Sequence, residues 1–444
     1  MVTNKESATC GKGVIMKAFR ELSTVEMQEQ LTVLMAEYEQ FVAKGLKLNM
    51  SRGKPSPQQL DLSMPLLDTV TSETTAETLK EGTADDLRNY GGLVGLPEAR
   101  KLMAGIMDVD AEDTIVCGNA SLNVMYDMIS QAFSHGIAGQ TAWAKLTEPV
   151  KFLCPVPGYD RHFALTERFG IEMIPVPLAA DGPDMDMVER HVNTDPSIKG
   201  IWCVPKYSNP TGTTYSDATV RRFTALSPAA KDFRIYWDNA YAVHDFDQPG
   251  ETLLSLKDAC AQTGTENLWY MFASTSKITF AGAGISALAA SPDNLAEIRG
   301  RLSFQTIGPD KLNQLRHVLF LNDMGGVRAH MQKHASIVAP KFETVLRALD
   351  DGLTGLDIGE WTRPKGGYFI SFVGLPNTAK RTVSLAKDAG MMLTDAGATY
   401  PYGNDPQDSN IRLAPTYPLV EELEDASKLF VLCVKIASLE ALLR

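Results

Sequence analysis

Short apolar segments alternate with helical segments through the middle of this chain, and this alternation constrains the fold more than any other feature. Each apolar segment is four to six residues long, which is typical of a buried strand. The strand candidates are 114–117, 151–155, 171–176, 200–204, 234–237 and 268–272. Between the first two, Leu122, Met125 and Ile129 fall on one face of a helix. The pattern predicts an α/β fold with a mostly parallel sheet that helices cover on both faces.

The rest of the chain predicts a second, smaller domain of the α+β class. A chain of 444 residues exceeds the size at which a single core usually stops growing. Outside the alternating region, helical spacing occurs at 22–44, 329–349 and 419–443, and strands are expected at 367–373 and 411–413. We therefore expect a loose N-terminal tail at 1–15, a large domain at 63–328, and a small domain built from 16–62 and 329–444.

Charge and composition argue against several classes of function. The net charge is −12 and the isoelectric point is near 5.2, whereas nucleic acids and acidic membranes are bound by basic surfaces. No apolar run is long enough to span a bilayer, and the N-terminus lacks the apolar segment of a signal peptide, so we expect a cytoplasmic protein. The cysteines and histidines show no metal-ligand spacing, so we expect no metal centre.

Polar residues follow four of the predicted strands, at the edge of the sheet where open α/β folds bind ligands. The sequence GNAS at 118–121 opens a helix, whose free N–H groups suit a phosphate. Asn209 lies in a turn after the fourth strand, Asp238 and Tyr241 follow the fifth, and Lys277 follows the last. Taken singly, these could be a helix cap, a turn asparagine, a paired carboxylate and a surface lysine.

Together the four groups favour one kind of cofactor. Lys277 lies between an apolar strand and a loop with Gly282 and Gly284, where desolvation would lower its pKa toward the neutral amine of a nucleophile. A carboxylate such as Asp238 needs a cation or donor at a buried strand end, and a protonated pyridine nitrogen would serve. A phosphate cradle, an amide, an Asp with a Tyr, and a Lys are the groups that pyridoxal phosphate needs.

Seven motifs extend this pattern over nearly the whole chain, from about Arg20 to the C-terminus. They are NYGG at 89–92, GNAS at 118–121, PGY at 157–159, SNPTG at 208–212, DNAY at 238–241, STSK at 274–277 and NIRL at 410–413. Their order and spacing resemble those of the fold-type I pyridoxal-phosphate aminotransferases. The strings SRGKPS, CPVPGYDRHF and SKITFAGAG are similar to a divergent bacterial group of aspartate aminotransferases.

The resemblance implies a role for each residue around the cofactor ring. Lys277 would be the covalent anchor and would then move the substrate proton. Asp238 would keep the pyridine nitrogen protonated, so that the ring accepts electrons. Tyr241 and Asn209 would bind the ring's phenolic oxygen, and Tyr159 would stack on the pyridine face.

The resemblance also implies how the phosphate and the substrate are bound. The residues expected around the phosphate are Asn119, Ala120, Ser121 and Ser274. Tyr90 would reach the phosphate of a neighbouring subunit, so a homodimer is expected. Arg412 would clamp the substrate α-carboxylate with its planar fork.

One position departs from the family pattern. The family usually has an arginine eight residues after the lysine to neutralise the phosphate, and that position here is Ile285. Thr279, or Lys311 or Arg301 from a partner chain, could compensate. The substrate's side-chain carboxylate also needs a cation, for which Arg52 and Arg301 are candidates.

The resulting hypothesis is an enzyme that exchanges amino groups between L-aspartate and 2-oxoglutarate in two half-reactions. An aminotransferase of other specificity (aromatic, 2-aminoadipate) is an alternative, as is a β-lyase or a decarboxylase, because the fold and cofactor do not fix the reaction. A non-enzymatic alternative is an aminotransferase-like regulatory domain. Such a regulatory protein would need a basic DNA-binding segment, and we expect none in the sequence before the first helix.

Overall fold

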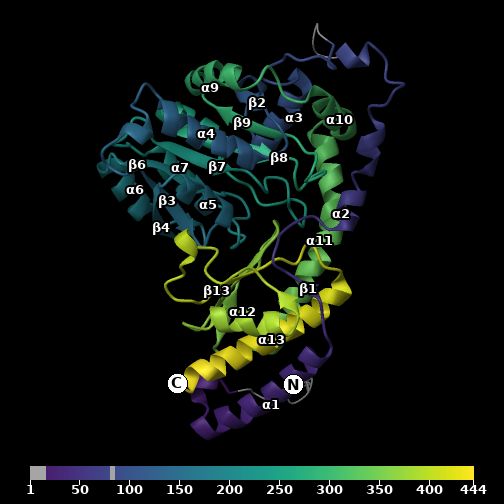
Figure 1. Cartoon of the computed structure of the whole chain (residues 1–444), viewed down its shortest axis with the longest axis vertical. Coiled ribbons are helices and arrows are strands. Elements are labelled where there is room, and N and C mark those ends of the chain that lie inside the picture. Colours follow the sequence, from purple (N-terminus) through teal and green to yellow (C-terminus); the bar gives the residue numbers. More distant parts are fainter. Residues whose placement is uncertain (1–16, 81–85) are drawn as a thin grey trace, which may run out of the picture.

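A computed structural model describes residues 17–80 and 86–444, so the predicted tail at 1–15 lies outside the described residues. Figure 1 shows a large sheet with its helices at the top and a smaller group of helices and strands at the bottom, joined by the long helix α11. None of the helices described is long and apolar enough to cross a membrane.

The large sheet has eight strands in the order β2-β9-β8-β7-β6-β3-β4-β5. Its strands are β2 (Thr114–Val116), β3 (Lys151–Val156), β4 (Glu172–Ala179), β5 (Gly182–Pro183), β6 (Ile198–Cys203), β7 (Arg234–Asp238), β8 (Trp269–Ser274) and β9 (Ser286–Ala290). The five central strands β8, β7, β6, β3 and β4 are parallel, while β9 runs antiparallel to both its neighbours. The predicted mostly parallel sheet is confirmed.

Helices bury both faces of this sheet, as the apolar composition of its strands requires. The helices of this part are α2 (Pro57–Asp61), α3 (Pro97–Met107), α4 (Ser121–His135), α5 (Asp160–Arg168), α6 (Met185–Thr194), α7 (Asp217–Thr224), α8 (Leu256–Thr263), α9 (Pro292–Gln305) and α10 (Lys311–Leu321). Side chains alternate across β7: Ile235 and Trp237 enter one core cluster and Tyr236 the other. The carboxyl ends of the parallel strands are thereby held at one edge.

A second core surrounds the smaller sheet at the bottom of Figure 1. Its strands are β10 (Gly359–Trp361), β11 (Ile370–Gly374) and β13 (Asn410–Leu413), all antiparallel, with the separate pair β1 (Leu48–Asn49) and β12 (Met391–Met392) beside them. The helices packed on it are α1 (Thr24–Ala43), α12 (Ala379–Asp388) and α13 (Val420–Leu442). The N-terminal helix therefore joins the C-terminal elements, in agreement with the α+β grouping.

Helix α11 (Met324–Leu353) begins five residues before the helical segment predicted from the sequence. Asp323 caps it by accepting from the N–H of Gly326, so two early glycines do not stop the helix. The predicted boundary near residue 328 falls inside α11, and the domain limits stay a prediction.

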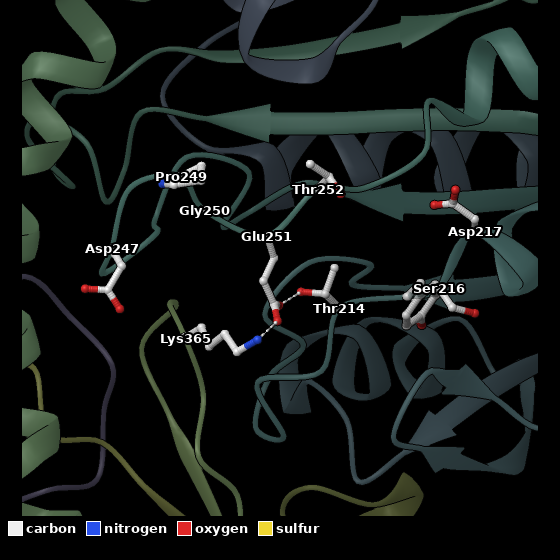
Figure 2. Close-up of a pocket in the computed structure, with 10 residues that line it drawn as sticks. Thr214, Ser216, Asp217, Asp247, Pro249, Gly250, Glu251, Thr252 and Lys365 are labelled. Atoms are coloured by element: carbon white, nitrogen blue, oxygen red, sulfur yellow. Dashed lines mark hydrogen bonds and ion pairs between the residues drawn. The ribbon is translucent and has the colours of Figure 1, made fainter.

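Strand β11 begins at Ile370 rather than at the predicted residue 367. Gly367 has φ +80°, and it lies against the side chain of Tyr207, so the chain turns there instead of extending. The turn joins the two cores: the N–H of Phe246 donates to the carbonyl of Lys365, and Lys365 pairs with Glu251 at 3.2 Å. Figure 2 shows Glu251 also accepting a hydrogen bond from Thr214. Both residues line a pocket of about 510 Å³.

Candidate active site

The predicted site residues come together because β6, β7 and β8 are adjacent and parallel. Asp238 ends β7, Ser274 ends β8, and the segment that holds Asn209 leaves the end of β6. Arg412 arrives from β13 in the smaller sheet and donates to Oδ1 of Asn209 at 3.2 Å. The site therefore lies where the edge of the large sheet meets the small sheet.

Asp238 is a buried carboxylate with one oxygen bonded and one oxygen free. Nε2 of His162 lies 3.1 Å from its Oδ2, and the His162 ring stacks on Trp202 with 4.3 Å between ring centroids. Oδ1 is buried and has no hydrogen-bond partner among the described residues. An ionised oxygen in that position is costly unless a donor meets it, so Oδ1 marks the place of a ligand donor.

Lys277 is partly buried, and desolvation lowers the pKa of its amine, although the nearby charge of Asp238 opposes the shift. Its Nζ lies 4.9 Å from the ring centroid of Tyr241. Nε2 of His244 and the hydroxyl of Tyr368 donate to the backbone carbonyl of Lys277 at 3.3 and 3.4 Å. The backbone is thus held from two sides, while the amine carries no ion pair within the described chain.

The GNAS segment lies at the N-terminus of α4, beside the loop that follows Lys277. The Asn119 side chain accepts from the N–H of Gly284 at 2.6 Å and donates to the carbonyl of Ala281 at 3.3 Å. These bonds occupy the amide in tying the two loops together. The first backbone N–H groups of α4, with Ser121 at its first position, therefore provide the donors for an anion.

Ile285 is buried in an apolar environment. Its N–H donates to the hydroxyl of Thr275 at 3.0 Å, and its side chain belongs to the core. His317 lies behind this point, with Nε2 2.9 Å from the hydroxyl of Thr279 and Nδ1 donating to the carbonyl of Asn313. Burial lowers the pKa of His317, so Nε2 accepts from the threonine and the cluster is neutral.

The two cations considered for this position have partners in their own chain. Lys311 donates to the carbonyls of Asn89 and Gly91, both at 2.7 Å. Arg301 pairs with Glu297 and donates to the carbonyl of Gly136. Lys311 therefore holds the NYGG segment, and Arg301 is bound to the C-terminal end of α4.

Arg412 is buried and surrounded by polar partners. It lies 4.8 Å from the centroid of the Phe369 ring, and NH1 donates to Oδ1 of Asp160 at 2.7 Å. NH2 is 3.4 Å from the hydroxyl of Thr394, which itself donates to the carbonyl of Ser51. The guanidinium is thus held flat at the meeting point of the two sheets.

The three predicted tyrosines and Arg52 differ in exposure. Tyr159 precedes α5 and meets the edge of His162, and burial raises its pKa to about 12. Burial also raises the pKa of Tyr241 well above its usual value. Tyr90 is 77% exposed, and Arg52 is also exposed.

Sequence analysis did not anticipate three of the contacting residues. His162 is three residues after Tyr159, a spacing that places both at the start of one helix and could have indicated a shared site. Asp160 lies between them, but its ion pair with Arg412 joins residues 252 positions apart. His317 had no local signal, since it lies on α10, between the STSK and NIRL motifs and inside neither.

Comparison with known proteins places the chain in one family. The family model described as aspartate amino-transferase matches residues 22–444. An aspartate aminotransferase of Corynebacterium glutamicum is 43% identical, over 96% of this chain and 99% of that protein. The crystal structure of an aspartate transaminase from the same species superimposes with a TM-score of 0.92 at 42% identity, covering 96% of this chain and 99% of that one.

A more distant structure shows the same fold. The α-aminoadipate aminotransferase of Thermus thermophilus, complexed with N-(5'-phosphopyridoxyl)-L-leucine, has a TM-score of 0.69 at 18% identity, covering 95% of this chain and 96% of that chain. The extent of the family match, together with the strand-end residues described above, leads to one conclusion: the chain belongs to the aspartate amino-transferase family.

Proposed function

We propose that this chain is a pyridoxal-phosphate-dependent aminotransferase that exchanges amino groups between L-aspartate and 2-oxoglutarate. The observation that carries the proposal is the buried Oδ1 of Asp238, which has no partner in the described part of the chain and lies on the strand next to the one that leads to Lys277. The near-full-length similarity to an aspartate aminotransferase of C. glutamicum supports the substrate pair.

The residues present fit pyridoxal phosphate. The free Oδ1 of Asp238 suits a protonated ring nitrogen, and the desolvated amine of Lys277 suits its aldehyde carbon. When bound, the cofactor supplies an aldehyde for the amino group and a ring that accepts electrons. The start of α4, with Asn119, Ala120 and Ser121, would receive the phosphate.

The chain's own groups would then divide the work. Nζ of Lys277 would hold the cofactor and would afterwards accept the proton from the substrate's Cα. Oδ1 of Asp238 would accept a hydrogen bond from the protonated ring nitrogen, and His162 fixes the other carboxylate oxygen. Because Arg412 donates to Oδ1 of Asn209, the amide Nδ2 of Asn209 faces away and is the group that would donate to the phenolic oxygen, beside Tyr241.

The phosphate site would differ from the family pattern in its charge. Ser274 donates its hydroxyl to Ser276 at 3.0 Å, which leaves the hydroxyl of Ser276 to donate onward. With Ile285 in the core and His317 neutral, backbone N–H groups and hydroxyls replace the arginine in this proposal. The helix dipole of α4 supplies the positive potential.

Substrate binding would use two arginines from the small-sheet side. Arg412 clamps the α-carboxylate, and Arg52 takes the side-chain carboxylate. The position of Arg52 supports this role, since Thr394 contacts Arg412 and donates to the carbonyl of Ser51 at 2.6 Å. A Cβ on the next residue, Gly53, would collide with the Phe369 ring that lies over Arg412.

A homodimer would complete the site. Lys311 fixes the carbonyls on either side of Tyr90, so the tyrosine projects from an anchored loop rather than a loose one. Phe304 and Ile307 are 94% and 63% exposed, and Gly308 packs against the backbone of Gly91 in the Tyr90 segment. We infer that this apolar surface is covered by a second copy and that Tyr90 reaches the phosphate there. A cytoplasmic location stays a prediction.

A single experiment tests the reaction. Purified holoenzyme is mixed with L-aspartate while the absorbance of the bound cofactor and the release of oxaloacetate are followed. We expect the spectrum to change and oxaloacetate to appear in equal amount, and 2-oxoglutarate to restore the spectrum. An unchanged spectrum with aspartate but a response to aromatic or 2-aminoadipate donors would assign another specificity. Release of ammonia or carbon dioxide would assign a lyase or a decarboxylase.

A further inference from the structure

Arg412, the proposed anchor of the substrate carboxylate, already holds a carboxylate of its own chain. NH1 donates to Asp160 at 2.7 Å and to Asn209 at 3.2 Å, which uses both of its hydrogens. NH2 has only the long contact of 3.4 Å with Thr394. Nε is buried and has no partner among the described residues. A carboxylate that binds the edge between NH1 and NH2 must therefore take a hydrogen that NH1 now donates to Asp160 or Asn209.

The Arg412–Asp160 ion pair differs from the Asp238–His162 contact in how far the carboxylate is exposed. Asp238 and His162 are 3% and 2% exposed, so neither can leave the other for water. Asp160 is 32% exposed, although the Arg412 that it meets is only 6% exposed. Because Asp160 lies in the first turn of α5 and borders solvent, its carboxylate can turn into water without unfolding the helix. This pair is exchangeable, and the Asp238 pair is fixed.

A counter-charge for Arg412 is needed when no substrate is bound. A buried cation without a partner is strongly destabilising, and Asp160 prevents that state. The two residues also come from different parts of the fold, since Arg412 lies on β13 and Asp160 on α5 beside the large sheet. The ion pair thus joins the two sheets in the substrate-free chain.

We propose that the Asp160 carboxylate competes with the substrate's α-carboxylate for Arg412. The proposal rests on the proposed function, in which Arg412 is the anchor for that carboxylate. A carboxylate binds guanidinium best through two N–H groups on one edge, and one of these is held by Asp160. Substrate binding then displaces Asp160 into solvent, and breaking the Asp160–Arg412 pair lowers the affinity for the substrate. Asp160 is a residue that sets substrate affinity, and no covalent bond changes in the exchange.

Replacing Asp160 with asparagine tests the competition, because the amide keeps the size of the side chain and removes its charge. Succinate, a dicarboxylate without an amino group, is titrated into the holoenzyme and its binding is followed by calorimetry. We expect the dissociation constant of succinate to fall about tenfold in Asp160→Asn, since the amide oxygen that replaces the carboxylate is neutral and holds Arg412 less tightly. The affinity for pyridoxal phosphate should stay unchanged. Glu167→Gln removes the same charge from the exposed side of α5 and should change neither constant.

The opposite result is equally clear. An unchanged or higher dissociation constant in Asp160→Asn overturns the proposal, because Asp160 would then only hold Arg412 in position. Asp160→Glu keeps the charge and should bind succinate as the wild-type protein does; tenfold tighter binding by this variant would also contradict competition. If the asparagine variant fails to fold, Asp160→Ser is measured with the same expectation.

Failure of the proposed function would look different. The wild-type holoenzyme would then neither bind succinate nor release oxaloacetate from L-aspartate. In that case, succinate binding gained by Asp160→Asn would still support competition at Arg412. A variant that also binds no succinate would overturn both.

Discussion

Lys277 and Arg412 are the two basic side chains at the centre of the site, and their surroundings are opposite. Lys277 follows a strand of the large sheet, carries no ion pair within the described residues, and has its pKa lowered by desolvation. Arg412 lies on the small sheet, pairs with Asp160, and touches Asn209, Thr394 and an aromatic ring. Lys277 has only the nearby charge of Asp238 and no ion pair within the described residues, whereas Arg412 is paired directly with a carboxylate.

The difference follows from what each group would do. A lysine that attacks a carbonyl must lose its proton, which a neighbouring carboxylate would hinder and desolvation helps. An arginine that holds a carboxylate must stay charged, and its fork must be kept in one orientation. The polar groups that hold the Lys277 segment are accordingly neutral: His244 and Tyr368 bond its backbone carbonyl rather than its amine.

The contrast between Lys277 and Arg412 has no basis if another lysine binds the cofactor covalently. We expect Lys277→Ala to abolish covalent trapping of the cofactor by borohydride, because no other amine would occupy the desolvated place beside Asp238. Mass spectrometry of the trapped protein gives the readout. Lys333→Ala removes an exposed lysine of α11 and should trap the cofactor as the wild-type protein does. Persistent trapping in Lys277→Ala would reject the assignment.

The next largest effect should come from Asp238, the buried carboxylate on the strand next to the one that leads to Lys277. Asp238→Asn leaves the volume unchanged but removes the charge that faces the ring nitrogen, and we expect kcat with L-aspartate to fall about 10³-fold. Cofactor trapping by Lys277 should remain, which separates this loss from misfolding. A kcat within tenfold of the wild-type value would show that the free Oδ1 of Asp238 has another purpose.

Local sequence was enough to predict the side of the site that holds Lys277. Strand lengths, apolar composition and the rule that ligands bind at strand ends placed Asp238, Asn209 and Lys277 together before any contact was known. The roles of these residues remain predictions. The predicted ends of α11 and β11 were wrong by a few residues, because an aspartate cap and a glycine turn against Tyr207 decided them.

The arginine side depended on contacts that sequence does not encode locally. Arg412 could be placed in a motif, but Asp160 carries no mark of its partner, since the two meet only in the folded chain, 252 positions apart in the sequence. The same holds for His317, which reaches Thr279 across 38 positions. Pairings of this kind follow from the packing of whole elements, and periodicity describes only one element at a time.

Replacing Arg412 with lysine tests whether the shape of the guanidinium matters in addition to its charge. Arg412→Lys keeps a positive charge but loses the planar fork, and we expect kcat/KM for L-aspartate to fall about 10²-fold, in the range of a lost hydrogen bond between charged groups. Most of the loss should lie in KM, with cofactor trapping unaffected. If Arg412→Lys has wild-type kinetics, the guanidinium geometry is irrelevant and Arg412 is not the carboxylate clamp.

The smallest effect concerns stability in acid. The neutral histidines around the Lys277 segment should become protonated as the protein unfolds, which lowers its stability. His244 and His334 are 5% and 2% exposed, and burial lowers the pKa of each to about 3. A histidine whose folded pKa is depressed contributes its full stability above its unfolded pKa of about 6.5 and loses it as the pH falls toward the folded pKa. Between pH 7 and pH 5, each should therefore cost about 2 kcal/mol of the free energy of unfolding.

Urea unfolding at the two pH values measures this loss, and His334→Gln isolates one share of it. The variant is expected to be less stable than the wild-type protein at pH 7, because Gln59 loses the ring nitrogen to which it donates. Its further loss on going to pH 5 should be smaller than that of the wild-type protein by about 2 kcal/mol. His191→Gln, a substitution on α6 far from this segment in the sequence, is the control and should keep the wild-type pH dependence. An identical acid response in His334→Gln would mean that His334 is already charged or solvated in the folded chain. The surroundings of Lys277 would then not be neutral, and they would no longer differ in this way from the charged surroundings of Arg412.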